Sequence, residues 1–144
     1  MGHHTYVAFT QASNDVVLAL PVDPRAAQAA RRALVKEGLD PDLDHTVCLL
    51  TSELVTNAIE HSGMGPTGRI VLAARLTPDF ARVEVRDSGP GFDPDLRAEA
   101  RGYGLRLTDM LASRWGVDRD PDAGTRVWFE VDRRRRRFPR RPGD

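Results

Sequence analysis

Apolar and polar residues alternate along this chain with two different periods, and the changes of period divide it into helices and strands. Residues 16–22 (V-V-L-A-L-P-V) form a short apolar run that predicts a strand. Residues 25–37 carry alanines and a leucine on one helical stripe, and they follow Asp23, a residue type that caps helix starts. A second apolar stripe predicts a longer helix from Pro41 to about Ser62. The first half of the chain is therefore expected to be one strand and two helices.

A period of two dominates the second half of the chain. Residues 69–76 and 81–87 alternate and flank a T-P-D turn, so they predict a β-hairpin. The other elements expected there are a glycine- and proline-rich loop, a helix and two strands, at residues 88–103, 105–111, 115–117 and 125–131. This order predicts an α+β fold, a two-layer sandwich in which three helices cover one face of a mostly antiparallel or mixed sheet.

Length and charge divide the chain into a domain with two ends. The 144 residues suit a single domain, expected at residues 15–132, after a flexible leader at residues 1–14. The net charge of zero hides an asymmetry, because residues 133–144 carry seven arginines and one aspartate while the preceding 132 residues carry 14 basic and 20 acidic side chains. We expect the arginine-rich end to be disordered and solubilising. Salt-dependent nucleic-acid binding is the alternative, and we regard it as the less favoured one.

Nothing in the chain suggests export or membrane insertion. No apolar run approaches the roughly 18 residues of a membrane span, and the first residues lack a signal-peptide pattern. The single cysteine, Cys48, cannot form an internal disulfide and lies in an apolar helical run, where a core residue is expected. The chain is therefore expected to be cytoplasmic.

Three polar residues are spaced four apart on the longer helix. Glu53, Asn57 and His61 therefore share one face of that helix. An amide oxygen there could bind Mg²⁺, an ion that takes oxygen ligands and usually binds through few protein groups and phosphates. Glu53 could then orient or deprotonate a nucleophile beside a terminal phosphate. A stripe of solvated polar side chains is the alternative interpretation of this helix.

Two glycine-containing turns could complete a nucleotide site. Asp87 ends a strand and could accept a hydrogen bond from an exocyclic amine such as that of adenine, while Gly89 and Gly91 permit tight backbone turns. The second turn precedes a helix, so its free N–H groups suit a phosphate; it contains Gly102, Tyr103, Gly104 and Leu105. It is not a P-loop, because no Gly-Lys-Ser/Thr follows.

A hydroxyl at the start of the last expected strand is the fourth element. Thr125 follows Gly124 and could close the adenine end of the pocket. Each of the four elements also occurs in ordinary turns and helices, and each is weak alone. Their presence together in one chain, in this order, favours a nucleotide site.

Four segments carry a resemblance to a known family. E-L-V-T-N-A-I-E-H, D-S-G-P-G, G-Y-G-L-R-L-T and G-T-R-V-W-F-E-V, in that order, resemble the GHKL ATPases, which include gyrase, Hsp90, MutL and histidine kinases. Within that family the chain is similar to the small anti-sigma-factor serine kinases of actinobacterial type, over about residues 14–132. The resemblance implies the Bergerat ATP-binding fold, with ATP and Mg²⁺ as ligands.

The resemblance also implies a role for each residue of the motifs. Asn57 would hold Mg²⁺ and Glu53 would be the catalytic base. Asp87 would bind the adenine amine beside Gly89 and Gly91, and Thr125 would support the adenine end. The phosphates would lie against Gly102, Tyr103, Gly104 and the amide of Leu105. His61 would make a helix-end contact.

The function that the resemblance implies is regulatory. The chain would transfer the γ-phosphate of ATP to a serine or threonine of an antagonist protein and would control transcription by sequestering a sigma factor, and a homodimer would be expected. Residues 92–101 give a lid of only about ten residues between the two glycine turns, which would exclude water poorly. The alternative is therefore a nucleotide-dependent interaction module with little or no kinase activity.

Overall fold

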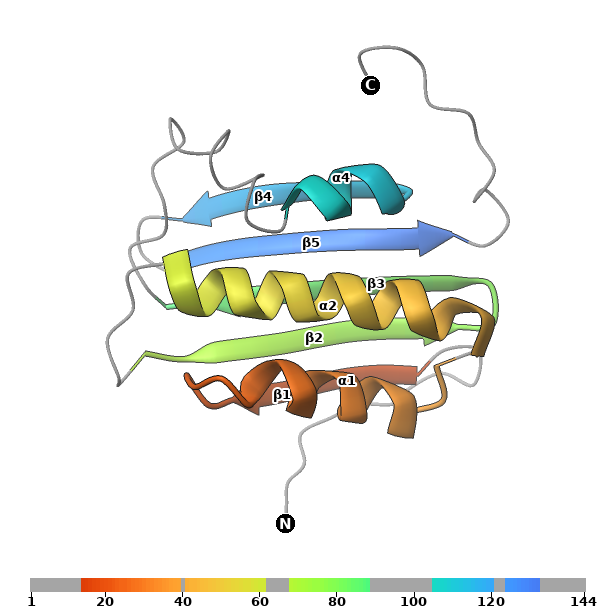
Figure 1. Ribbon diagram of the computed structural model, residues 1–144, viewed down its shortest axis with the longest axis horizontal. Helices are drawn as coiled ribbons and strands as arrows, with labels where there is room; N and C mark the ends of the chain where they lie inside the picture. The colour runs from red at the N-terminus through yellow and green to blue at the C-terminus, as the bar shows by residue number, and fades with distance from the viewer. Residues whose placement is uncertain (1–13, 40, 62–67, 89–104, 121–123, 133–144) are drawn as a thin grey trace.

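The described part of the chain forms two layers, with helices lying across one face of a β-sheet (Figure 1). The computed structural model describes residues 14–39, 41–61, 68–88, 105–120 and 124–132. The helices of this part are α1 (Ala26–Lys36), α2 (Pro41–His61) and α4 (Arg106–Leu111). The strands are β1 (Asn14–Leu20), β2 (Ile70–Thr77), β3 (Phe80–Asp87), β4 (Arg114–Asp120) and β5 (Gly124–Asp132).

The five strands form one sheet in the order β1-β2-β3-β5-β4, and each neighbouring pair is antiparallel. Helix α2 lies over the middle of this sheet, with α1 on the side of β1 and α4 on the side of β4 (Figure 1). The predicted α+β sandwich with three covering helices is thus confirmed.

The hydrophobic core lies between the two layers because each layer presents one apolar face. Strands β2 and β3 alternate between buried and less buried side chains. Their inward rows meet the apolar stripes of α1 and α2, in which Leu34, Leu50 and Leu54 are at most 2% exposed. Burying each such leucine contributes about 1.5–3 kcal/mol to stability. Phe129 of β5, fully buried, is among the largest core side chains.

The ends of α1 follow the signals in the sequence. Asp23 accepts a hydrogen bond from the Arg25 backbone N–H at 2.7 Å through its carboxylate, and another from the Ala26 N–H at 3.0 Å through its carbonyl. The helix begins at Ala26 and ends at Lys36, one residue inside each predicted boundary. Gly38 then adopts a φ of +96°, which ends the helix.

The β2–β3 hairpin turns at its predicted place. Thr77 pairs with Phe80, so Pro78 and Asp79 form an exposed two-residue turn. The Thr77 hydroxyl donates to the Phe80 carbonyl at 3.3 Å. Because Ile70 pairs with Asp87 at the other end of the ladder, this turn and Asp87 lie at opposite ends of the sheet.

Two strands differ from the predicted ranges. Strand β1 covers Asn14–Leu20 rather than residues 16–22, because Pro21 has no N–H to continue a ladder. Strand β4 covers Arg114–Asp120 rather than residues 115–117. It pairs with β5 along its whole length, and the charged side chains that conceal it in the sequence belong to an edge strand.

The α-helices in the described residues are either too short or too polar to cross a bilayer.

Candidate functional site

Polar side chains that are almost fully buried gather at one end of the two layers. The last turns of α2, the end of β3 and the start of β5 lie together at that end (Figure 1). They carry Asn57, Asp87 and Thr125, which are 2%, 4% and 1% exposed. Three residues that the sequence singled out thus lie at the same end of the fold. A buried polar group normally has a partner, so the side-chain oxygens of Asn57 and Thr125, which have none among the described atoms, require an explanation.

Asn57 occupies a position of α2 that faces into the protein. Its neighbours Leu54 and Ala58 are core residues, yet the Asn57 side-chain oxygen, Oδ1, has no hydrogen-bond partner among the described atoms. Leaving such a group unsatisfied costs about 1–3 kcal/mol. A hard cation such as Mg²⁺ would satisfy the oxygen, because it binds amide and carboxylate oxygens. The residue therefore fits the ligand role that the sequence suggested.

Glu53 lies one turn before Asn57 on the same side of α2. It is half-buried, and no hydrogen bond or ion pair to a described residue engages its carboxylate. A carboxylate without such a partner, beside a buried amide oxygen, is available to a ligand or a proton. Its role as a base stays a prediction.

Asp87 and Thr125 are direct partners in the β3–β5 ladder. The Thr125 hydroxyl is buried and has no hydrogen-bond partner among the described atoms. The chain leaving β3 is fixed at Ser88, whose N–H donates to the Arg69 carbonyl at 3.1 Å and whose hydroxyl accepts from the Arg69 N–H at 2.9 Å. The pair therefore offers an acceptor and a free hydroxyl side by side, as the proposed adenine end requires.

Gly124 makes the close approach of β5 to Asp87 possible. Its φ is +98°, and a Cβ at this position would lie 1.9 Å from the Asp87 carbonyl oxygen. Every other residue type would collide with the backbone there, because even alanine carries that carbon. In the sequence Gly124 is only the residue before Thr125, whereas in the structure it sets the spacing of the two strands at this end of the sheet.

The remaining predicted residues divide between the described part and the rest of the chain. Leu105 is fully buried immediately before α4, which begins at Arg106 rather than at residue 105. Asp109 of α4 accepts a hydrogen bond from the Trp115 indole N–H at 2.9 Å, which joins α4 to β4. The side chain of His61 and five predicted residues lie outside what the structure describes; the five are Gly89, Gly91, Gly102, Tyr103 and Gly104.

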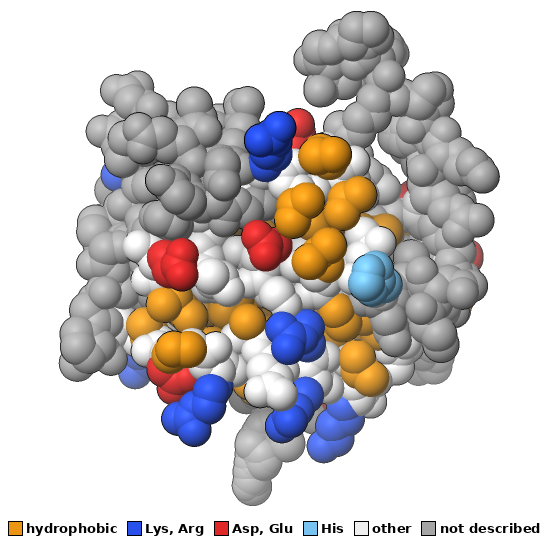
Figure 2. Space-filling view, viewed as in Figure 1, with side chains coloured by type: hydrophobic (Ala, Val, Ile, Leu, Met, Phe, Trp, Pro, Cys, Tyr) orange, Lys and Arg blue, Asp and Glu red, His pale blue; other side chains and the backbone are white. Residues whose placement is uncertain are grey.

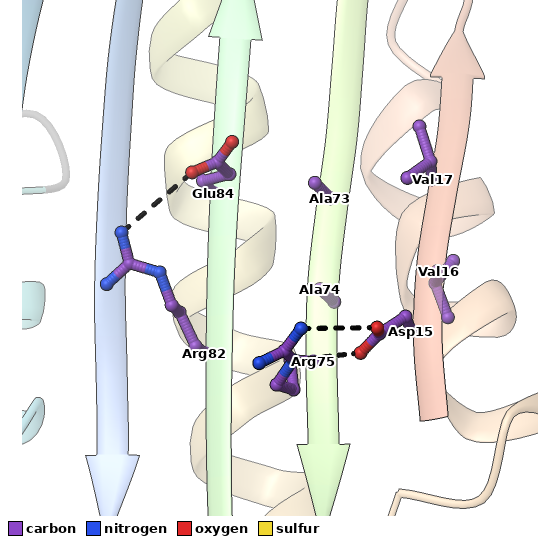
Figure 3. A pocket seen from close by; sticks show the side chains of 8 residues that line it. All are labelled: Asp15, Val16, Val17, Ala73, Ala74, Arg75, Arg82 and Glu84. Atoms are coloured by element: carbon purple, nitrogen blue, oxygen red, sulfur yellow. Dashed lines mark hydrogen bonds and ion pairs between the residues drawn. The ribbon is translucent and has the colours of Figure 1, made fainter. Parts of the chain in front are cut away.

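A separate hollow lies on the other face of the sheet. It encloses about 400 Å³ over β1, β2 and β3, with Val17 and Ala73 among the side chains that line it (Figure 3). The side chains at its rim are longer, and they include Arg75, Arg82 and Glu84. Asn57, Asp87 and Thr125 do not line it. The hollow is therefore distinct from the candidate site.

Ion pairs cross this outer face in rows set by strand register. One row of charged side chains runs through all five strands and consists of Asp15, Arg75, Arg82, Glu130 and Arg114. Its ion pairs join Asp15 to Arg75 and Glu130 to Arg82 and Arg114. Glu130, only 8% exposed, accepts hydrogen bonds from Arg82 at 2.7 Å and from Arg114 at 2.9 Å. The hydrogen bond and charge of Glu130 raise the pKa of Arg114.

A second group of contacts continues the ionic pattern toward β4. Arg126 bonds to Asp118, and this hydrogen bond is the main cause of the raised pKa of Arg126. Beside it, the Arg82 guanidinium lies 4.4 Å from the ring centre of Trp128. Trp128 packs over Gly116, where a Cβ would come within 2.8 Å of the ring. This network is not apparent in the sequence, because its members lie far apart in the chain and meet only through register.

The fold and the buried polar residues can now be compared with known proteins. Residues 19–131 match the family described as the histidine kinase-like ATPase domain. This match covers most of the chain and almost all of its described part, so the chain belongs to that family. Membership implies that the chain binds ATP.

Individual relatives include one protein found by sequence and two found by structure. An uncharacterised protein of Streptomyces coelicolor is 36% identical over 76 residues, which are 49% of this chain and 71% of that protein. The crystal structure of the RsbU and RsbW domains of Rv1364c from Mycobacterium tuberculosis matches 82% of this chain, with a TM-score of 0.62 and 25% identity. This chain covers only 32% of that chain. Full-length ShkA, solved with AMPPNP, matches less well, with a TM-score of 0.47 and 21% identity over 78% of this chain and 30% of that chain.

Proposed function

We propose that this chain binds ATP with Mg²⁺, transfers the γ-phosphate to a serine or threonine of an antagonist protein, and sequesters a sigma factor, as anti-sigma-factor serine kinases do. The observation that carries the proposal is the buried Asn57 oxygen, which has no partner among the described atoms. The family implies ATP binding, and this oxygen is a suitable ligand for the metal that accompanies a triphosphate. The similarity to a structure with an RsbW domain supports the choice of subgroup.

Each residue of the site has a distinct task in this proposal. Asn57 holds Mg²⁺, which neutralises phosphate charge when bound. Asp87 accepts a hydrogen bond from the adenine amine, and Thr125 supports the same end of the base. The phosphates would be held by Gly102, Tyr103, Gly104 and the Leu105 amide, and Gly89 and Gly91 would allow the chain to turn after Asp87.

Glu53 acts on the protein substrate. It lies one turn from Asn57 and has a carboxylate that no described residue engages. In the transfer, the substrate hydroxyl oxygen bonds to the γ-phosphorus, the bond from that phosphorus to the bridging oxygen of ADP breaks, and Glu53 accepts the hydroxyl proton. Removing the carboxylate should therefore slow transfer while leaving nucleotide binding nearly intact.

Two measurements test the proposal. Isothermal titration calorimetry with ATP and Mg²⁺ should show binding to the wild-type chain and much weaker binding to Asn57→Ala. Gln28→Ala, which removes an exposed amide from α1, is the matched control and should bind like wild type. If the Asn57→Ala chain binds ATP and Mg²⁺ as tightly as the wild type, the metal assignment is wrong.

Phosphate transfer needs its own assay, because the alternative function also includes ATP binding. Radiolabelled γ-phosphate should move from ATP to a candidate antagonist in the presence of wild type, and Glu53→Gln should slow the transfer by about 10²- to 10⁴-fold. Asp79→Ala, an exposed carboxylate at the hairpin turn, is the matched control. Tight ATP binding without any transfer would instead favour a nucleotide-dependent interaction module, which the short segment at residues 92–101 also suggests.

A further inference from the structure

A serine closes the sheet directly after Asp87. The Ser88 N–H donates to the Arg69 carbonyl at 3.1 Å, and the Ser88 hydroxyl accepts the Arg69 N–H at 2.9 Å. Alternate facing pairs of an antiparallel ladder exchange both such bonds through their backbones. Here the side chain of Ser88 replaces its own carbonyl, as a serine hydroxyl can do. The pair beyond Ile70 and Asp87 is therefore still joined, although the two strands end there.

Contacts on two sides hold the backbone of Asp87 in place. On the β2 side, the bonds between Ser88 and Arg69 fix the chain that follows it. On the β5 side, Asp87 pairs with Thr125, and Gly124 approaches its carbonyl oxygen closely. The rotamers open to a side chain depend on its backbone angles, so this backbone limits the directions in which the Asp87 carboxylate can point.

Charges on the helices give this direction more weight. Helix α2 borders the candidate site and carries acidic residues but no lysine or arginine. In the space-filling view, acidic side chains lie over α2, whereas basic ones gather over α1 (Figure 2). Helix α2 thus offers a triphosphate no opposite charge. Contact with the base therefore matters more for binding, and with it the orientation of Asp87.

The replacement of a carbonyl by a hydroxyl gives Ser88 a task at the site. We propose that Ser88 is a positioning residue, whose hydroxyl bond to the Arg69 N–H orients the Asp87 carboxylate toward the exocyclic amine of adenine. The inference rests on the ATP binding proposed above and adds a residue that makes the site selective for that amine. Without the hydroxyl, the Arg69 N–H turns to water and the end of the ladder opens locally. Both Ser88 and Arg69 are exposed, so their change leaves the core intact.

Two nucleotides that differ only in the amine measure this role. Calorimetry with Mg²⁺ compares ATP with purine riboside triphosphate, which lacks the exocyclic amine. Wild type should bind ATP about 10- to 150-fold more tightly than the analogue, as for a hydrogen bond to a charged group. Ser88→Ala should reduce this ratio of affinities about 2- to 10-fold by weakening the binding of ATP alone. Ser88→Thr, which keeps a hydroxyl, should restore the ratio.

Ser113 provides a matched control at the opposite end of the sheet. Its N–H donates to the Glu130 carbonyl at 2.7 Å, and its hydroxyl accepts the Asp132 N–H at 2.9 Å, so it makes the same kind of contact as Ser88. Asp132 pairs with Phe80, beside the hairpin turn. Ser113→Ala should therefore lower the free energy of unfolding and leave the ratio of affinities unchanged.

Hydrogen exchange tests the contact without nucleotide. The Arg69 amide, followed by NMR, should exchange at least about twofold faster in Ser88→Ala than in wild type, and at the wild-type rate in Ser88→Thr. Unchanged exchange in Ser88→Ala would show that the hydroxyl does not hold this N–H, and the inference would be wrong.

The binding results separate failure of the inference from failure of the proposed function. If Ser88→Ala keeps the wild-type ratio, or weakens both nucleotides equally, Ser88 does not position Asp87, and the inference is wrong while ATP binding stands. A ratio that falls as much in Ser113→Ala would assign the effect to stability, with the same consequence. If wild type binds both nucleotides equally, Asp87 does not recognise the amine, and that assignment and the inference are both wrong. If wild type binds neither, the proposed function is wrong and the inference falls with it.

Discussion

The outer face of the sheet and the polar end of the helix-covered side differ in how their polar groups are paired. On the outer face, the carboxylates of Asp15, Glu84, Asp118 and Glu130 each have at least one arginine partner. On the helix-covered face, the side-chain oxygens of Asn57 and Thr125 are buried without any partner among the described atoms. The unpaired oxygens lie at the end of the sheet where β3 ends and β5 begins, which is where we propose that nucleotide binds.

This difference separates groups that stabilise the fold from groups that we propose bind nucleotide. A paired group contributes to the free energy of unfolding, whereas an unpaired buried group lowers it and persists where a ligand supplies the missing partner. Substitutions on the outer face should therefore change stability and leave nucleotide affinity alone. Substitutions at the polar end of the covered face should do the reverse.

Asn57→Leu should give the largest effect and should move the two properties in opposite directions. Loss of the oxygen ligand should weaken binding of ATP with Mg²⁺ about 10- to 150-fold, as for a hydrogen bond to a charged group. Removal of the unpaired buried amide should raise the free energy of unfolding without nucleotide by about 1–3 kcal/mol. Calorimetry measures the affinity for ATP and urea denaturation measures the free energy of unfolding. A variant that is less stable but binds ATP as tightly as wild type would contradict the binding role of Asn57.

Gly124→Ala should affect stability and binding together, because Gly124 fixes the spacing of β5 from Asp87. A Cβ there meets the Asp87 carbonyl, and the positive φ is unfavourable for alanine, so we expect a loss of about 2 kcal/mol and weaker ATP binding. Gly116→Ala is the matched control on the outer face. This substitution should displace the Trp128 ring and lower the free energy of unfolding without changing the affinity for ATP. A loss of ATP affinity in Gly116→Ala would show that the outer face also affects nucleotide binding.

Glu130→Ala tests the paired face alone. The carboxylate is 8% exposed and bonds to both Arg82 and Arg114, so its loss should lower the free energy of unfolding by about 1–2 kcal/mol. Affinity for ATP should not change. Urea denaturation and calorimetry on the same preparation check both, and unaltered stability would show that the network contributes nothing.

Arg75→Ala should give the smallest effect. The Arg75 side chain is 62% exposed, so its ion pair with Asp15 is weakened by solvent. The free energy of unfolding, measured by urea denaturation, should fall by no more than about 1 kcal/mol, and the fall should be smaller in high salt. A larger loss would mean that the hollow beside Arg75 is structurally important.

The sequence predicted most of the fold because the local patterns agree with the tertiary structure. The apolar stripe of α2 and the alternation of β2 and β3 mark their buried faces directly. Strand β4 was predicted too short, since Gly116 and the charges of Asp118 and Arg119 conceal it. Their positions make sense only beside β5, where Gly116 leaves room for Trp128.

The candidate site was predictable in part for the same reason. Asn57 stands out in the sequence as a polar residue next to apolar positions and Thr125 as a hydroxyl at the start of the last strand, but their burial without partners among the described atoms is a property of the packed structure. The need for Gly124 depends on a contact between β5 and the end of β3, 37 positions apart in the printed sequence. The outer rows of ion pairs depend on register, which no local pattern specifies.

The short turn between β2 and β3 is a suitable site for attaching a tag or a label. Pro78 and Asp79 are exposed there, at the opposite end of the sheet from Asp87, and the ladder closes at Thr77 and Phe80. An epitope or a fluorescent label inserted between these two residues would protrude into water without disturbing the ladder. It would let the chain be immobilised or followed by fluorescence with the end of the sheet that carries Asp87 and Thr125 left accessible.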